Sequence, residues 1–191
     1  MTNKIKIQFS FLIAFIPLGA FSRIIPHMPN FSPLGAIGLF ESAHLDKKWQ
    51  AFLIPIAATW LSDLFINNVI YAQYYPKFTG FYQGFYWQYG SYLLISLAGL
   101  AIFNKINTPK VLTGALASTA IFYIVSNLGC WIGSAFYPQN LGGLMTCYTA
   151  GIAFFKGTLL GDLFFSGVLF SGYYLLQSKV SFFKLSNVEY A

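Results

Sequence analysis

The chain has 191 residues, of which 57% are hydrophobic and 20% aromatic, while only 8% carry a charge. With a mean hydropathy of +0.61, it lacks the charged surface that a water-soluble domain of this length needs. The composition excludes a soluble globular protein and predicts a polytopic membrane protein, a single domain over residues 1–191. The net charge of +6 is therefore interpreted as a topology signal and not as a sign of nucleic-acid binding.

Apolar segments of about 20 residues, the length that crosses a bilayer, lie near residues 7–25, 50–70, 87–104, 110–135 and 146–177. The first segment follows Lys4 and Lys6 as in a signal peptide, but it lacks a small-x-small cleavage site, so we expect a retained helix. Residues 34–45 form a sixth apolar segment, which is short enough to be either re-entrant or a short span.

The positions of the basic residues decide between five and six spans. With six spans and a cytoplasmic N-terminus, eight of the eleven basic residues fall inside: Lys4, Lys6, Lys47, Lys48, Lys105, Lys110, Lys179 and Lys184. A five-span arrangement would put residues 46–49 and 107–110 on opposite sides and lose this asymmetry. The positive-inside rule therefore predicts an all-α integral membrane bundle of six transmembrane helices, the second one short, with both termini cytoplasmic.

Three nearly uncharged segments rich in aromatic residues would then face outward, at residues 26–33, 71–87 and 133–148. A single Tyr or Trp at a membrane interface is an ordinary belt residue. Three such segments on one face also describe a lid over a pocket for a small, partly apolar ligand, and their concentration on one side favours the lid.

Two aspartates occupy matching contexts, in ATWLSDLF at residues 58–65 and in GTLLGDLF at residues 157–164. Spans three and six run in opposite directions, so the match is either chance or an inverted repeat of the kind found in transporters. Helical spacing of i, i+4 and i+8 gives each span one polar stripe. The stripes are Thr59, Asp63 and Asn67 in one span, and Thr158, Asp162 and Ser166 in the other.

An aspartate at this depth costs about 2.5 to 3.5 kcal/mol, so both should face the protein interior. They either hold the bundle together, by accepting hydrogen bonds from Thr, Ser or Asn on neighbouring helices or by pairing with Arg23 or Lys156, or they titrate a proton, or they contact a substrate. Beside the stripes, Ala58 with Ser62 and Gly157 with Gly161 form small-xxx-small pairs that would let another helix approach closely.

The candidate substrate-binding residues are polar or aromatic side chains of the stripes and of the outer ends of the spans. They are Arg23, His27, Asn30, Asp63, Asn67, Asn127, Trp131, Tyr137, Tyr148 and Asp162. For Arg23 the alternative is a side chain that snorkels to the interface. Cys130 and Cys147 are expected as small buried hydrophobes, with a disulfide only if both face an oxidising compartment.

No catalytic motif is present. The two histidines and two cysteines lack zinc spacing, and GIAFFKGT, residues 151–158, lacks the glycine that precedes the lysine of a phosphate-binding loop. The sequence therefore predicts neither an enzyme nor a metal or cofactor.

Four stretches together resemble a known family: SRIIPHMPNFSPLGAIGLF, PIAATWLSD, WQYGSYLLISLAG, and SNLGCWIG followed by YPQNLGGLMTCYTAGIAFFKGTLLGDLFF. They resemble an uncharacterised family of small bacterial membrane proteins described as transport proteins. That family is similar to the S-components of energy-coupling factor (ECF) transporters, six-helix proteins of the cytoplasmic (inner) membrane that capture vitamins from outside.

The resemblance implies a pocket that opens to the extracytoplasmic side and uptake of a vitamin or related metabolite. It also implies partners: a small-molecule substrate, membrane lipid, and an energising module of a transmembrane scaffold and ATPases. Two other functions stay open. One is a proton-coupled secondary carrier that uses Asp63 or Asp162, and the other is a non-transport membrane assembly subunit.

Overall fold

A computed structural model of the chain describes residues 3–45 and 47–179, and this part of the chain is all-helical. It forms six α-helices: α1 (Asn3–Ile24), α2 (Leu34–His44), α3 (Trp49–Phe65), α4 (Phe85–Ile102), α5 (Thr108–Trp131) and α6 (Leu141–Lys179). A π-helical turn η1 (Ile66–Ile70) continues α3, and a short 3-10 turn η2 (Ala72–Tyr74) follows it. The six apolar segments of the sequence correspond to these six helices.

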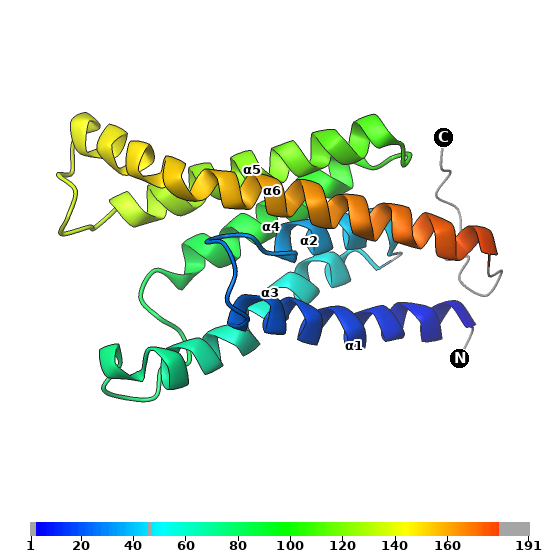
Figure 1. The fold of residues 1–191 in the computed structure, drawn as a ribbon, viewed down its shortest axis with the longest axis horizontal. Helices are drawn as coiled ribbons and strands as arrows, with labels where there is room; N and C mark the ends of the chain where they lie inside the picture. The colour runs from blue at the N-terminus through cyan, green and yellow to red at the C-terminus, as the bar shows by residue number, and fades with distance from the viewer. Residues whose placement is uncertain (1–2, 46, 180–191) are drawn as a thin grey trace.

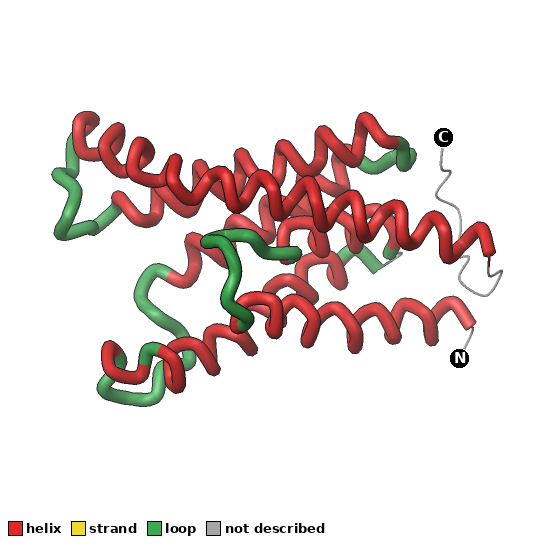
Figure 2. Tube along the Cα trace, viewed as in Figure 1, coloured by secondary structure: helices red, strands yellow, loops and turns green. Residues whose placement is uncertain are grey.

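Successive helices run in alternating directions along the bundle (Figure 1). The start of α1, the end of α6 and the connections after α2 and α4 lie at one end of the molecule. The connections after α3 and α5 lie at the other end, and Figure 2 shows them as two well-separated loops. The connection after α1, residues 25–33, lies nearer the middle of the bundle, between these two loops.

Three helical stretches are long and apolar enough to cross a membrane: Trp49–Ile70, Thr108–Trp131 and Leu141–Lys179. Their polar side chains point inward, since Thr59, Thr119 and Asp162 are buried, whereas large apolar side chains such as Leu116 and Leu160 are exposed. A polar interior under an apolar surface is typical of a protein surrounded by lipid, so the structure has the character of a membrane protein.

Helix α2 is the centre of the bundle. It has 11 residues, all of them buried, and it contacts each of the other five α-helices. At 1.5 Å per residue it is about 16 Å long, roughly half the thickness of a hydrocarbon core. The sixth apolar segment is therefore short, as expected, and it is enclosed by protein on all sides.

Pro55 shows how α3 and α4 are joined. A proline inside a helix has no N–H, so it leaves the carbonyl four residues earlier without its helical partner. That carbonyl belongs to Ala51, and it accepts a hydrogen bond of 2.8 Å from the Ser96 hydroxyl of α4. Ser42 of α2 donates to the carbonyls of Gly38 and Ser96 at 2.6 and 2.9 Å, which ties the same turn of α4 to α2.

Only one of the two small-xxx-small pairs packs against a helix. Ala58 of α3 lies beside Gly19 of α1, and Ser62 of the same pair bonds to Arg23, also of α1. The α6 pair, Gly157 and Gly161, instead meets the backbone of residues 29–32, a loop. A β-carbon on Gly157 would overlap the Pro29 carbonyl oxygen, so the expected helix–helix contact is wrong there: glycine is needed because a loop backbone touches α6.

The ends of α5 and α6 differ from the expected spans. Helix α5 ends at Trp131, before the left-handed Gly133 at φ 72°, and not at residue 135. Helix α6 begins at Leu141 and not near residue 146, because the Asn140 side chain accepts a hydrogen bond of 2.9 Å from the Gly143 N–H, as a helix cap does. Tyr148 therefore lies inside α6 and not on an outer loop.

The two cysteines do not form a disulfide. Cys147 is buried, as expected, whereas the expectation that Cys130 is buried is wrong, because Cys130 is exposed.

Gly157→Ala should lower the free energy of unfolding by about 1 to 3 kcal/mol, because the added methyl overlaps the loop backbone. The matched control is Gly167→Ala in the same helix, where no atom lies within 4 Å of the new β-carbon. The control should be neutral or stabilising by about 0.5 to 1 kcal/mol. Unfolding in detergent measures both variants, and equal stabilities would contradict the described packing of residues 29–32 on α6.

Candidate functional site

Two neighbouring, partly open cavities lie beside the loop after α1 in the described part of the bundle. The larger of the two has a volume of about 350 Å³ and is lined by residues of α1, α2, η1, α4, α5 and α6 and by that loop. Its polar lining consists of Arg23, His27, Asn30, Ser32, Tyr71, Gln88, Tyr92, Ser118, Thr158 and Asp162. The smaller, of about 210 Å³, lies between α5 and α6 and shares Asn30, Phe122 and Thr158 with the larger.

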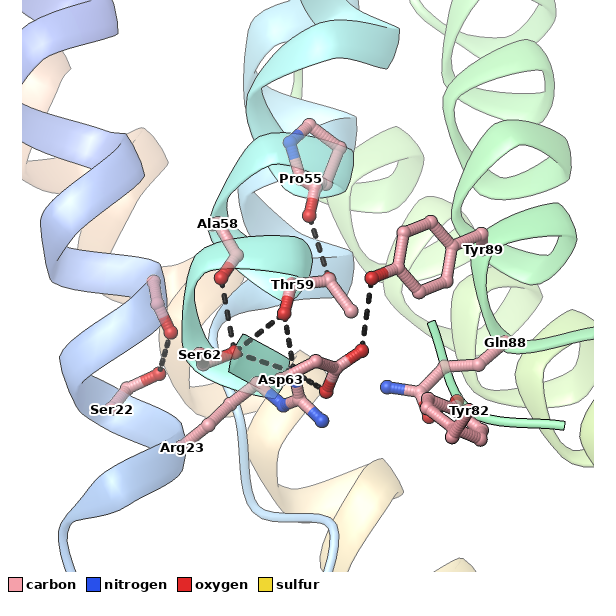
Figure 3. Close-up of polar contacts among 11 residues, drawn as sticks. Ser22, Arg23, Pro55, Ala58, Thr59, Ser62, Asp63, Tyr82, Gln88 and Tyr89 are labelled. Atoms are coloured by element: carbon pink, nitrogen blue, oxygen red, sulfur yellow. Dashed lines mark hydrogen bonds and ion pairs between the residues drawn. The ribbon is translucent and has the colours of Figure 1, made fainter. Parts of the chain in front are cut away.

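Arg23 lines the larger cavity and is held there by an ion pair. Arg23, in the last turn of α1, places Nη1 2.7 Å from Asp63 Oδ1 of α3. The same nitrogen donates to the Thr59 carbonyl at 3.0 Å and to the Ser62 hydroxyl at 2.5 Å (Figure 3). The pairing of Asp63 with Arg23, one of the alternatives from the sequence, is confirmed, so Arg23 does not snorkel freely to the interface.

Two tyrosines extend this cluster toward α4. The Tyr89 hydroxyl donates to Asp63 Oδ2 at 2.9 Å, which gives the second carboxylate oxygen a partner. Tyr82, in the loop before α4, donates to the Gln88 side chain at 2.8 Å, and Figure 3 places it close to Asp63. Burial and then the nearby negative charge of Asp63 raise the pKa of Tyr82 well above its ordinary value, so its hydroxyl remains a donor.

Asp162 of α6 lines the cavity in a different setting. Its Oδ2 accepts a hydrogen bond of 2.8 Å from Thr119 of α5. Its Oδ1 and the Ser118 hydroxyl both lie against Gly35 of α2, where a β-carbon would overlap them. Ser118 is 1% exposed, and its Oγ lies close to the Asp162 side chain but has no hydrogen-bond partner of normal geometry within the described residues. Acceptance from a threonine on a neighbouring helix, one of the alternatives for Asp162, is confirmed.

The loop after α1 supplies two of the predicted residues. His27 donates from Nδ1 to the Met28 carbonyl at 2.7 Å, which leaves Nε2 as the acceptor of the neutral ring. Asn30 adopts φ 61°, a left-handed conformation that asparagine tolerates better than most residues. Because Asn30 lines both cavities, this turn forms part of the wall between them.

The remaining predicted residues lie elsewhere. Asn127 and Tyr137 line only the smaller cavity. Trp131 donates from its indole to the Pro138 carbonyl at 2.9 Å and lines neither cavity. Tyr148 donates to the Ile124 carbonyl at 2.7 Å and accepts at its own carbonyl from Tyr123 at 2.6 Å, so it joins α6 to α5.

Asn67 is buried in the π-helical turn, a feature that often accompanies functional sites. Its Nδ2 has no hydrogen-bond partner within the described part of the chain, yet the residue does not line the larger cavity. The neighbouring residues Ile66 and Tyr71 do. Asn68 holds the loop that follows, since its side chain exchanges two hydrogen bonds with the Thr79 backbone, at 2.7 and 2.9 Å.

Both polar stripes are buried, as expected: the aspartates are each 3% exposed. They are not chemically equivalent, because Asp63 pairs with a guanidinium and Asp162 with a hydroxyl. Within residues 3–45 and 47–179, no group of three His, Cys, Asp or Glu side chains is placed to hold a metal ion.

A family model matches residues 3–185 of the chain. The chain belongs to the family of unknown function DUF6580. No curated protein and no solved structure matches it.

Several residues at the site of this DUF6580 protein escaped the sequence analysis. Ser118 and Thr119 form a polar pair that interrupts the apolar segment at residues 110–135, and this interruption could have predicted a polar contact inside the bundle. Tyr89 and Gln88 gave no comparable signal, because an aromatic or amide residue at the start of a span is typical of an interface. Their roles follow from the approach of α4 to α3.

The Arg23–Asp63 pair can be tested with a double-mutant cycle. Arg23→Met or Asp63→Asn alone should lower the free energy of unfolding by up to about 3 to 5 kcal/mol, because each leaves a buried partner uncompensated. The asparagine keeps an acceptor for Tyr89. The double variant should lose clearly less than the sum of the two single variants, whereas additive losses would show that the pair contributes no coupling.

Proposed function

We propose that this DUF6580 protein is a substrate-binding membrane protein for the uptake of a small molecule, a vitamin or related metabolite. In this proposal six helices cross the bacterial cytoplasmic membrane, both termini are cytoplasmic, and the cavities face the extracytoplasmic side. The carrying observation is a partly open cavity, lined in part by a loop, in which the buried carboxylate of Asp162 has only the hydroxyls of Thr119 and Ser118 beside it and no counter-ion in the described residues.

The energetics of polar groups in lipid support a binding role. Polar side chains that only hold helices together have their hydrogen bonds satisfied by protein, as Ser42 and Ser96 do. An incompletely bonded buried hydroxyl costs up to about 1 to 3 kcal/mol. Ser118 has the Asp162 side chain as a close neighbour but no hydrogen bond of normal geometry, and a ligand in the cavity would complete its hydrogen bonding.

The dimensions also suit a small molecule. Ligand pockets occupy about 300 to 1,000 Å³ and combine an apolar lining with a few polar groups. The larger cavity, at about 350 Å³, has apolar walls from Ile66, Ile95 and Phe122 beside its polar residues. It has roughly the volume of a dozen water molecules.

The resemblance to ECF S-components indicates the energy source that we propose for uptake. In such systems a separate transmembrane scaffold with ATPases drives uptake, which fits a chain without a phosphate-binding loop. The expected partners are therefore an energising module and the substrate, and copurification from membranes is the direct assay for the module.

A screen of purified protein against vitamins and related metabolites should find a compound that raises Tm, because a ligand that binds only the folded state stabilises it. Ser118→Ala should change the stability of the free protein by no more than about 1 kcal/mol and should weaken that ligand by about 3- to 30-fold. Ser166→Ala is the matched control, since Ser166 is equally buried, also has no hydrogen bond of normal geometry in the described residues, and lines neither cavity.

The control should keep the ligand-induced shift in Tm. If no compound shifts Tm in a sample shown to be folded, the proposed function fails.

A proton-coupled carrier is the second candidate, and one observation directs it to Asp162. Asp63 is paired with Arg23, whereas Asp162 lines the cavity with only hydroxyl partners in the described residues. A carrier should therefore lose the pH dependence of uptake in Asp162→Asn, while Asp63→Asn should keep it. Uptake by reconstituted vesicles at several pH values measures this, and an unchanged profile in Asp162→Asn rules out the carrier.

A further inference from the structure

The charged side chains that line the larger cavity indicate which class of ligand it would bind. Two charged side chains line it, Arg23 and Asp162. The guanidinium of Arg23 is neutralised by Asp63 at 2.7 Å, and it also bonds to Ser62 and Thr59. The cavity is thus left with one carboxylate, Asp162, for which no cation within residues 3–45 and 47–179 forms a partner.

The Asp162 carboxylate is poised to accept from a ligand. Thr119 occupies Oδ2, while Oδ1 lies against Gly35 next to the Ser118 hydroxyl, which contacts Asp162 without normal hydrogen-bond geometry. Gly35 has no side chain to fill this corner. Two oxygen acceptors side by side suit a group with several N–H donors, and an ammonium has three.

Aromatic rings stand on the same cavity wall. Tyr92 of α4 and Phe122 of α5 line the cavity with ring centroids 5.7 Å apart, beside Ser118. The faces of such rings attract cations, and the attraction grows in a site withdrawn from water. The other titratable groups of the lining, His27 and Tyr71, come from the loop after α1 and from the residue after η1, and neither forms an ion pair with Asp162 in the described part of the chain.

We propose that the larger cavity binds a small organic amine in its protonated form, with the ammonium between Asp162 Oδ1 and Ser118 Oγ and against Tyr92 and Phe122. This inference rests on the proposed function and names its substrate class. An anionic ligand would meet the carboxylate with like charge, and a neutral ligand would leave that buried carboxylate without a counter-ion.

The test compares ligands that share a skeleton and differ in charge. Tryptamine is the cation, tryptophol the neutral analogue and indole-3-acetate the anion; phenethylamine, phenethyl alcohol and phenylacetate repeat the series on a smaller ring. Tm and equilibrium affinity are measured in detergent for the wild type and for three variants. In the wild type the amine of at least one series should raise Tm more than its neutral and anionic analogues do.

Each variant has its own expected result. Asp162→Asn should weaken binding of the amine at least about tenfold, equivalent to about 1.4 kcal/mol, and leave the affinity for the neutral analogue unchanged. Asp63→Asn removes the counter-ion of Arg23, so it should weaken binding of the amine and strengthen binding of the anion. Glu41→Gln is the matched acid-to-amide control, because Glu41 is fully buried but lines neither cavity, and it should keep the wild-type order of affinities.

Three results overturn the inference. If the neutral or anionic analogues bind and the amines do not, the substrate class is wrong and the proposed binding function stands. If an amine binds equally well to Asp162→Asn, its site is not this cavity. If no member of either series binds and the metabolite screen is also negative, the inference and the proposed function both fail.

Discussion

The ion pair between Arg23 and Asp63 organises the cavity end of the bundle. It joins the last turn of α1 to α3 and fixes the point from which the loop at residues 25–33 departs. In a low-dielectric setting neither charge is tolerated alone, and each is further bonded, by Ser62, by the Thr59 carbonyl and by Tyr89. The positive charge of Arg23 is thereby neutralised inside the protein, and the net charge of the cavity lining depends on that neutralisation.

Helix α2 complements the ion pair from the centre of the bundle. Its small residues allow close contact at two levels: Gly35 faces Asp162 and Ser118, and Gly38 faces Ser96 of α4. A full-length helix in this position would fill the space that the cavity occupies. The short central helix thus both supports the surrounding helices and leaves room for a binding site near its N-terminal end, at Gly35.

Apolar periodicity was sufficient to predict the six helices and the two buried polar stripes, because segment length and the cost of a charge in lipid are local properties of the sequence. Apolar periodicity could not predict the tertiary contacts. Nothing in the sequence around Tyr148 distinguishes a lid residue from one that joins α5 and α6 through backbone carbonyls. Likewise, the small residues Gly157 and Gly161 predicted close approach, but whether a helix or a loop approaches depends on where α1 ends.

That loop contact has a mechanical consequence. The backbone at Pro29 rests directly on Gly157, and Ser32 rests on Gly161, with no side chain of α6 between them. Close backbone contact of this kind prevents the segment from moving any closer to α6, and it means that a movement of α6 toward residues 29–32 would displace this part of the cavity lining. Helix α6 runs the whole length of the bundle to its opposite end (Figure 1), so a single helix both contacts the cavity loop and reaches the far end of the molecule.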